Sequence, residues 1–118
     1  MAPKIFVFGS NLAGIHGAGA ALFAKLHCGA IRGVGVGLQG YSYAIPTKDH
    51  NIKTLPLSAI ALHVADFIAF AKAHPAMQFE VTRIGCGLAG YTAADIAPMF
   101  RDAPENCSLP DGWRGQWA

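Results

Sequence analysis

The amino-acid sequence predicts an α/β fold with three layers, in which a mixed or parallel sheet carries helices on both faces. Short apolar runs that end in glycine or proline alternate along the chain with segments whose apolar residues recur at helical spacing. Such an alternation of strands and helices is typical of a sheet built through helical crossovers. The 118 residues suit one domain with a single core, which we expect to span residues 1–118.

Four segments are expected to form strands. KIFVFG (4–9) is apolar and ends in glycine, as a buried strand does. YSYAIPT (41–47) alternates in polarity and should end near its proline, which cannot donate to a ladder. FEVTRIG (79–85) is the third strand, and NCSLP (106–110) is a short last one. Residues 30–40, which directly precede YSYAIPT, are too rich in glycine for a regular element, and we expect a loop there with at most an edge strand.

The two longer helices are expected at residues 17–27 and 58–75. The first places apolar residues on one face and ends at a glycine. The second is the clearest helix: Ser58 can cap its N-terminus and Pro75 stops it. Its apolar stripe consists of Ile60, Val64, Phe67, Ile68 and Ala71.

A third helix is expected at residues 92–103. Thr92 and Asp95 have the spacing of a capping box at its start. Pro98 should kink this helix, or its start should lie nearer Asp95, because proline removes a helical hydrogen bond.

The composition excludes several classes of protein. Hydrophobic residues make up 53% of the chain and charged residues 14%, which is too apolar for a disordered protein. The longest apolar run is interrupted well before the ~20 residues of a membrane span, and the N-terminus has no signal-peptide pattern. The three cysteines have no C-x-x-C spacing, which favours a reducing cytoplasm. The five histidines have no ligand spacing, so neither a metal nor a cofactor is expected.

The charge distribution points to a small anionic ligand. The net charge is +2, and four basic residues precede the first acidic residue, Asp49. A nucleic-acid binder usually gathers several lysines and arginines on one face, and no such run occurs here. We therefore expect a phosphorylated nucleoside as the partner, and neither a nucleic acid nor a membrane.

Three loops consist mainly of small residues: 9–21, 33–40 and 85–90. The last two match G-x-G-x-x-G. The match within 33–40 leads into a strand-like run, so a simple glycine-rich connection is preferred there. The match at 85–90 lies between a strand and a helix, but the chain has no room for the remaining βαβ unit of a Rossmann domain.

Loops 9–21 and 85–91 each lead from a strand into a helix. In open α/β sheets, ligands bind beyond the carboxyl ends of strands, where free backbone N–H groups and the helix dipole attract a phosphate. If the two strands are neighbours, the loops face each other and can hold a diphosphate from both sides. The alternative is that these glycines only permit tight turns.

Four side chains in these loops have two interpretations each. The Asn11 amide can bind ribose hydroxyls or satisfy its own loop. His16 can reach a ligand or pack the loop, and Tyr91 can cover a ribose or base or pack at the rim. Cys86 lies at a glycine-rich helix start, which can lower a thiol pKa, but it has no evident histidine partner and is not expected to be a nucleophile.

The strings HGAGAA, with Asn11 before them, and GCGLAGY resemble the two ligand loops of the macro domain, an ADP-ribose-binding fold. The resemblance implies that Asn11, Gly17 and Gly19 hold the distal ribose and that Gly85 to Gly90 hold the diphosphate. The expected ligand-binding residues are Gly9, Ser10, Asn11, His16, Gly17, Ala18, Gly19, Gly85, Cys86, Gly87, Leu88, Ala89, Gly90 and Tyr91.

GAGAALFAKLHCG, the strand ending in TK, and RIGCGL resemble, in this order, the small macro domains that remove terminal ADP-ribose from proteins. That subgroup is described as using a lysine, matched by Lys48, and an aspartate, whose position is Ala89 here. The resemblance implies hydrolysis of an ADP-ribosyl bond by Lys48, with Asp49 as the substitute acid. Many macro domains bind adenine through an early aspartate, and no acid precedes Asp49, so adenine selectivity is not expected.

FGSN, HGAGAA, QGYSYAIPTKD and IGCGLAGY also resemble, nearly end to end, a family of short macro-like proteins frequent in bacteriophages, which would place the chain in a host cytoplasm. The leading hypothesis is binding of ADP-ribose or a related NAD-derived nucleotide. The alternative is a non-catalytic module for RNA ends or ADP-ribosylated protein, in which Tyr41, Tyr43 and Trp113 stack on bases. A third possibility is an interaction protein whose glycines serve only turns.

Overall fold

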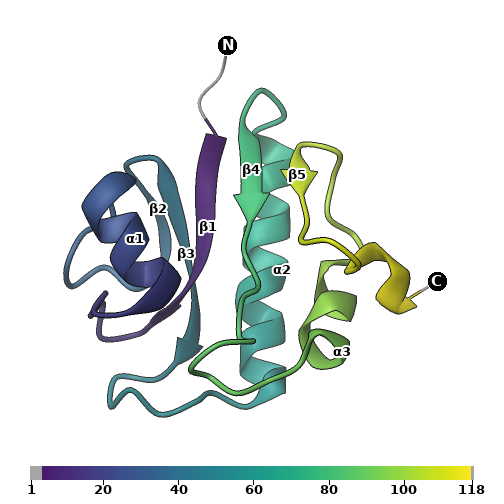
Figure 1. Ribbon diagram of the computed structural model, residues 1–118. Helices are drawn as coiled ribbons and strands as arrows, with labels where there is room; N and C mark the ends of the chain where they lie inside the picture. The colour runs from purple at the N-terminus through teal and green to yellow at the C-terminus, as the bar shows by residue number, and fades with distance from the viewer. Residues whose placement is uncertain (1–3, 118) are drawn as a thin grey trace.

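The computed structural model describes residues 4–117 and contains one five-stranded sheet with the strand order β2-β3-β1-β4-β5 (Figure 1). The central strand β1 (Lys4–Asn11) pairs in parallel with β3 (Ser42–Lys48) and with β4 (Gln78–Val81). At the edges, β5 (Cys107–Ser108) is parallel to β4, and β2 (Gly37–Gln39) is antiparallel to β3. The predicted α/β fold with a mixed, mostly parallel sheet is confirmed.

The helices lie on both faces of the sheet. The helix α1 (Gly19–His27) covers one face, and α2 (Leu57–Ala73), α3 (Ala93–Ile96) and the 3-10 helix η1 (Ala97–Phe100) cover the other (Figure 1). A second 3-10 helix, η2 (Arg114–Trp117), follows β5. None of the helices within residues 4–117 has the length and apolar character needed to cross a bilayer.

The two faces of β1 supply two cores, because successive side chains of a strand point to opposite sides. Val7 belongs to the larger core under α2, and Phe8 packs with the alanines of α1 on the other face. In the larger core Phe67 is fully buried and its ring meets those of Tyr43 and Phe79 edge-on at 5.0 and 5.4 Å between centroids. Each such burial contributes about 1.5–3 kcal/mol.

The apolar stripe predicted for α2 is confirmed, since all five of its residues are buried. The predicted cap at Ser58 is wrong: the helix begins one residue earlier, Pro56 occupies the N-cap position, and no side chain caps it. Pro56 has the extended backbone of an N-cap residue, with φ −64° and ψ 154°, so the chain enters the helix without a hydroxyl cap.

Several other boundaries differ from the predictions by one to three residues: β1 extends to Asn11, α1 begins at Gly19, α2 ends at Ala73, η1 ends at Phe100, and β5 is confined to Cys107–Ser108. Two further differences, at the ends of β3 and β4, bear on the site. β3 runs through Pro46 to Lys48, because β2 pairs only with residues 42–44 and leaves that side of Pro46 without a strand neighbour. β4 ends at Val81 and not at residue 85. Both the backbone N–H and the hydroxyl of Thr82 donate to the Val7 carbonyl, at 3.1 and 2.7 Å, and the chain then turns out of the ladder.

The capping box of Thr92 and Asp95 is confirmed in both of its hydrogen bonds. The expected irregularity at Pro98 is also present, as the short helix α3 changes there into the 3-10 helix η1. This arrangement fixes the end of the loop that leaves β4, which is the second loop of the candidate site.

Candidate ligand-binding pocket

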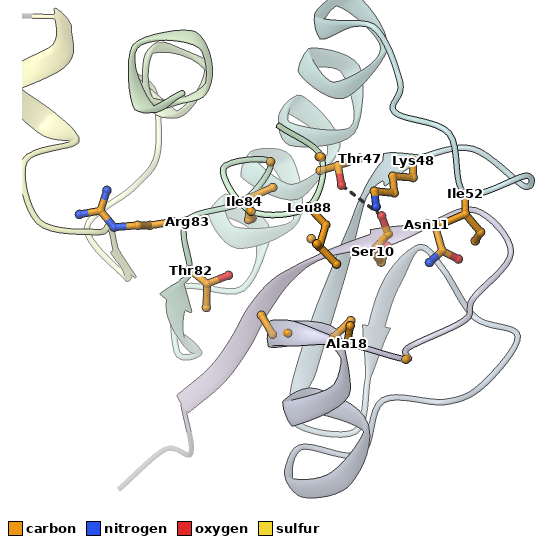
Figure 2. A pocket seen from close by; sticks show the side chains of 18 of the residues that line it. Ser10, Asn11, Ala18, Thr47, Lys48, Ile52, Thr82, Arg83, Ile84 and Leu88 are labelled. Atoms are coloured by element: carbon orange, nitrogen blue, oxygen red, sulfur yellow. Dashed lines mark hydrogen bonds between the residues drawn. The ribbon is translucent and has the colours of Figure 1, made fainter. Parts of the chain in front are cut away.

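The carboxyl ends of three neighbouring parallel strands meet at one edge of the sheet and border a single pocket of about 380 Å³ (Figure 2). Parallel strands that lie side by side end at the same edge, which is where open α/β sheets bind ligands. The residues that line the pocket come from both predicted loops and from the segment after β3: Gly9, Ser10, Asn11, Ile15, Gly17, Ala18, Gly19, Ala20, Ala21, Thr47, Lys48, Ile52, Thr82, Arg83, Ile84, Gly85, Gly87, Leu88 and Ala89.

The first loop brings the N-terminus of α1 to the pocket. Ala18 is the N-cap residue and no side chain caps the helix. The backbone N–H groups of residues 17–21 donate to no other atom within residues 4–117. Uncapped N–H groups and the positive end of the helix dipole together favour an anion at this position.

The second loop is closed by two backbone hydrogen bonds and leaves three of its amides without an acceptor among residues 4–117. The N–H of Tyr91 donates to Gly85 O at 2.9 Å and that of Gly90 to Gly87 O at 3.0 Å, which closes the loop. The N–H groups of residues 87–89 have no acceptor in the described part of the chain. Gly85 needs its positive φ of 77° for this turn, and a Cβ there would also lie 3.0 Å from the Ile96 side chain.

The two loops are close to each other. A Cβ added to Gly9 would lie 3.6 Å from the backbone nitrogen of Gly85, so β1 and the second loop approach within ordinary contact distance of a single methyl group. The sequence analysis required the two strands that lead into these loops to be neighbours in the sheet. β1 and β4 pair in parallel, so this requirement is met.

The Asn11 and His16 side chains contact their own loops, as the second of the two interpretations given for each residue predicted. The Asn11 side chain accepts from the Ile15 N–H at 3.0 Å and donates to the Ile15 carbonyl at 2.8 Å. His16 is buried behind the loop, where its Nε2 lies 3.0 Å from Ile31 O and its ring meets Phe8 edge-on. Asn11 still lines the pocket, whereas His16 does not.

Cys86, Gly90 and Tyr91 are likewise outside the pocket lining. The Tyr91 hydroxyl donates to Leu55 O at 2.7 Å, so this side chain anchors the second loop beside the start of α2. The Cys86 thiol points to the Ile84 carbonyl, and burial raises its pKa above the ordinary value. A raised pKa agrees with the sequence interpretation that Cys86 is not a nucleophile.

Lys48 and Asp49, the two candidate catalytic residues, lie in different surroundings. Lys48 lines the pocket, at the same end as Asn11 (Figure 2). Asp49 does not line it: its Oδ1 accepts the backbone N–H groups of Asn51 and Lys53 at 2.8 and 3.0 Å. These two bonds hold the pKa of Asp49 below its ordinary value. Its carboxylate therefore shapes the turn after β3, and no Asp or Glu of residues 4–117 lines the pocket.

Segment 33–40, which matches the same glycine pattern, supports the first loop from behind. A Cβ on Gly35 would lie 2.0 Å from Asn11 O, so only glycine fits between these backbones. The Ser10 hydroxyl donates to Gly35 O, and the Gly33 N–H donates to Gly14 O at 2.9 Å. The interpretation of 33–40 as a connection outside the site agrees with its position. The close approach explains Gly35, and Gly33 and Gly37 both have a positive φ of 90°.

Several lining residues are absent from the sequence prediction. Thr47 and Thr82 lie at strand ends, and the strand order would have pointed to them. Ile52 carries no such signal, because its positive φ of 61° cannot be inferred from the sequence. Arg83 lines the pocket through part of its side chain and points away from it, toward Asp111 O at 3.3 Å (Figure 2).

Two of the three aromatic side chains proposed for base stacking are buried. Tyr43 belongs to the core under α2, and Trp113 packs against Phe100 with ring centroids 5.5 Å apart. Tyr41 alone of the three is exposed. The stacking surface expected for the RNA-binding alternative is therefore wrong at two positions.

No cluster of three or more histidine, cysteine, aspartate or glutamate side chains within residues 4–117 has metal-binding geometry. Comparison of the chain with protein-family models, with curated proteins and with solved structures gave no match. The resemblance to the macro domain stays a prediction.

Proposed function

We propose that the protein binds ADP-ribose or a related NAD-derived nucleotide in this pocket. The observation that carries the proposal is that two sets of free backbone N–H groups, at residues 17–21 and 87–89, border one cavity. Amides that converge from a helix N-terminus and from a glycine-rich turn suit the two phosphates of a diphosphate.

The charges around the pocket support an anionic ligand. Lys48 contributes to the lining, whereas the guanidinium of Arg83 points away from the pocket, and no carboxylate of the described residues lines it. The volume of about 380 Å³ lies in the lower part of the 300–1,000 Å³ range of small-molecule sites. A diphosphate with one attached sugar fits such a space, and the rest of the nucleotide would extend over the rim.

Binding is tested by calorimetry with ADP-ribose on the wild type and on a matched pair of variants. Gly87 lines the pocket and an added Cβ there meets nothing within 4 Å, so we expect Gly87→Val to fold, as its melting temperature will check, and to fill space beside the free amides. Gly115 in η2 has the same steric freedom outside the pocket lining, which makes Gly115→Val the control.

We expect a micromolar Kd for the wild type, about −8 kcal/mol. We expect Gly115→Val to bind equally well and Gly87→Val at least tenfold more weakly. Absence of binding by the wild type would refute the proposal. Equal affinity of Gly87→Val and the wild type would place the ligand elsewhere.

Hydrolysis of an ADP-ribosyl bond is a second candidate, favoured by one observation. Lys48 lies on the pocket wall, and a lysine side chain can act as a nucleophile when its amine is deprotonated. Turnover of an ADP-ribosylated protein by the wild type and by Lys48→Ala tests it. Equal turnover by both would remove Lys48 from the reaction, and no turnover by a wild type that binds ADP-ribose would leave binding as the function.

A further inference from the structure

We infer that the pocket selects its ligand by phosphate and sugar and accepts different nucleobases, because an apolar rim formed by Ile15, Ile52 and Leu88 holds the base by its faces alone. This inference rests on the proposed function and adds which part of the nucleotide determines affinity. Four observations support it: the exposure of these side chains, the backbone of Ile52, a hydrogen bond between the segments that carry Ile52 and Leu88, and the polar groups around the rim.

The rim consists of large apolar side chains that are open to solvent although they line a pocket. Ile15 is 49% exposed, Ile52 41% and Leu88 77%. They come from three different segments, one after each of the strands β1, β3 and β4. Figure 2 shows Leu88 between Ile84 and Ser10, and Ile52 at the end of the pocket near Asn11. Apolar side chains gathered at a pocket mouth typically mark a surface that a ligand covers.

Ile52 has a backbone conformation that its side chain disfavours. A β-branched residue at φ 61° is a genuine outlier, and such conformations persist only where neighbouring contacts enforce them. Asp49 provides these contacts. Its carboxylate accepts from Asn51 and Lys53, its N–H donates to Lys53 O at 2.8 Å, and its carbonyl accepts from the Ile52 N–H at 3.1 Å. The turn thereby presents an isoleucine where glycine or asparagine would be relaxed.

A hydrogen bond links the two segments that carry Ile52 and Leu88. The Thr54 hydroxyl donates to Ala89 O at 3.1 Å. Two apolar side chains on segments linked in this way can contact the faces of a planar ring, and every base has such faces, so this contact discriminates little between bases.

Two of the polar side chains near Ile52 are engaged in their own loops: the Asn11 amide is bonded to Ile15, and the Asp49 carboxylate accepts from Asn51 and Lys53. Lys48 also lines this end of the pocket, but a lysine side chain offers only hydrogen-bond donors, and adenine, guanine and uracil all carry acceptors, so this residue discriminates little between bases. Discrimination by a polar edge requires buried donors and acceptors dedicated to it. The rim therefore contributes affinity through ring contact, and discrimination falls to the amides that face the phosphates.

The test is calorimetry with three nucleoside diphosphate riboses, carrying adenine, guanine or uracil, and with ribose 5-diphosphate, which has no base. We expect Kd values within about threefold among the three bases and at least tenfold weaker binding without a base. A preference of more than tenfold for one base overturns the inference while the proposed function stands. Absence of binding by every ligand overturns both.

Ile52→Asn separates a ligand contact from a structural role. Asparagine tolerates positive φ, so the variant should have a melting temperature equal to or above that of the wild type. It should nevertheless bind all three nucleotides about fivefold more weakly, with unchanged affinity for ribose 5-diphosphate. Leu62→Ser is the control, because Leu62 is 70% exposed on α2 and does not line the pocket. Equal weakening of all four ligands by Ile52→Asn, or no weakening of any, refutes the inference.

Discussion

Gly35→Ala tests whether segment 33–40 positions the first loop. The added Cβ would lie 2.0 Å from Asn11 O and 3.1 Å from the Cα of Leu12. Ordinary contact begins at 3.4 Å, so the two backbones must separate by about 1.4 Å. No side chain can move aside to relieve this contact, because both neighbours are backbone.

The loss in the free energy of unfolding caused by Gly35→Ala has two parts. Overpacking of this kind costs about 1–3 kcal/mol. Separation also breaks the hydrogen bond from the buried Ser10 hydroxyl to Gly35 O, and an unsatisfied buried hydroxyl costs about 1–3 kcal/mol more. The two parts sum to about 4 kcal/mol at their midpoints, which lowers the melting temperature of a protein of this size by roughly 15 °C.

Thermal unfolding followed by circular dichroism measures the change, with Gly115→Ala as the control, since a Cβ at Gly115 meets nothing within 4 Å. ADP-ribose affinity should fall as well, because Ser10 and Asn11 line the pocket. A Gly35→Ala protein that melts within 2 °C of the wild type would refute the close approach of these two segments.

Three further predictions follow from the packing and titration of individual side chains. Phe67→Ala should cost about 3–5 kcal/mol in urea unfolding, and a loss below 1 kcal/mol would contradict the ring contacts in the core under α2. Carbon-detected NMR titration should give Asp49 a pKa below 3.8, because two backbone N–H groups stabilise its carboxylate. Its contribution to stability is thus complete above pH ~4 and is lost as the pH falls through the lower folded pKa; a pKa at or above 3.8 would contradict the turn. Burial raises the pKa of Cys107 to about 11, so its thiol should resist iodoacetamide at pH 8 while the half-buried Cys28 and Cys86 react. Because the unfolded thiol has the lower pKa, this group stabilises fully below pH ~9 and progressively less up to pH ~11; faster alkylation of Cys107 than of Cys28 would contradict its burial.

Local patterns predicted the elements that depend on local physics. The stripe of α2 and the capping box at Thr92 depend on residues three and four apart, and both are present. Ser58 failed as a cap because proline two residues earlier already starts the helix, a competition that the hydroxyl pattern does not reveal. The end of β4 was misplaced because Ile84 is apolar and buried like a strand residue, although the ladder has already stopped at Val81.

The pocket depends on contacts between distant segments, and its prediction was correspondingly partial. The two loops can face each other only if β1 and β4 are neighbours in the sheet. The sequence does not determine the strand order, so this pairing could be stated only as a condition. The direction of the Asn11 and His16 side chains is decided by carbonyl groups of the folded loops, at Ile15 and Ile31. Ile52 was missed because nothing in its neighbourhood, which contains no glycine, indicates a left-handed backbone.

The order of the strands has a consequence for biosynthesis. β1 lies at the centre of the sheet and is made before both of its partners, and its partner β4 begins at Gln78, so Lys4 pairs with a residue 74 positions later. During synthesis the apolar strand β1 must therefore stay without its full set of neighbours until β4 has left the ribosome. Slow translation between α2 and β4 should lengthen the interval in which a chaperone can bind that strand.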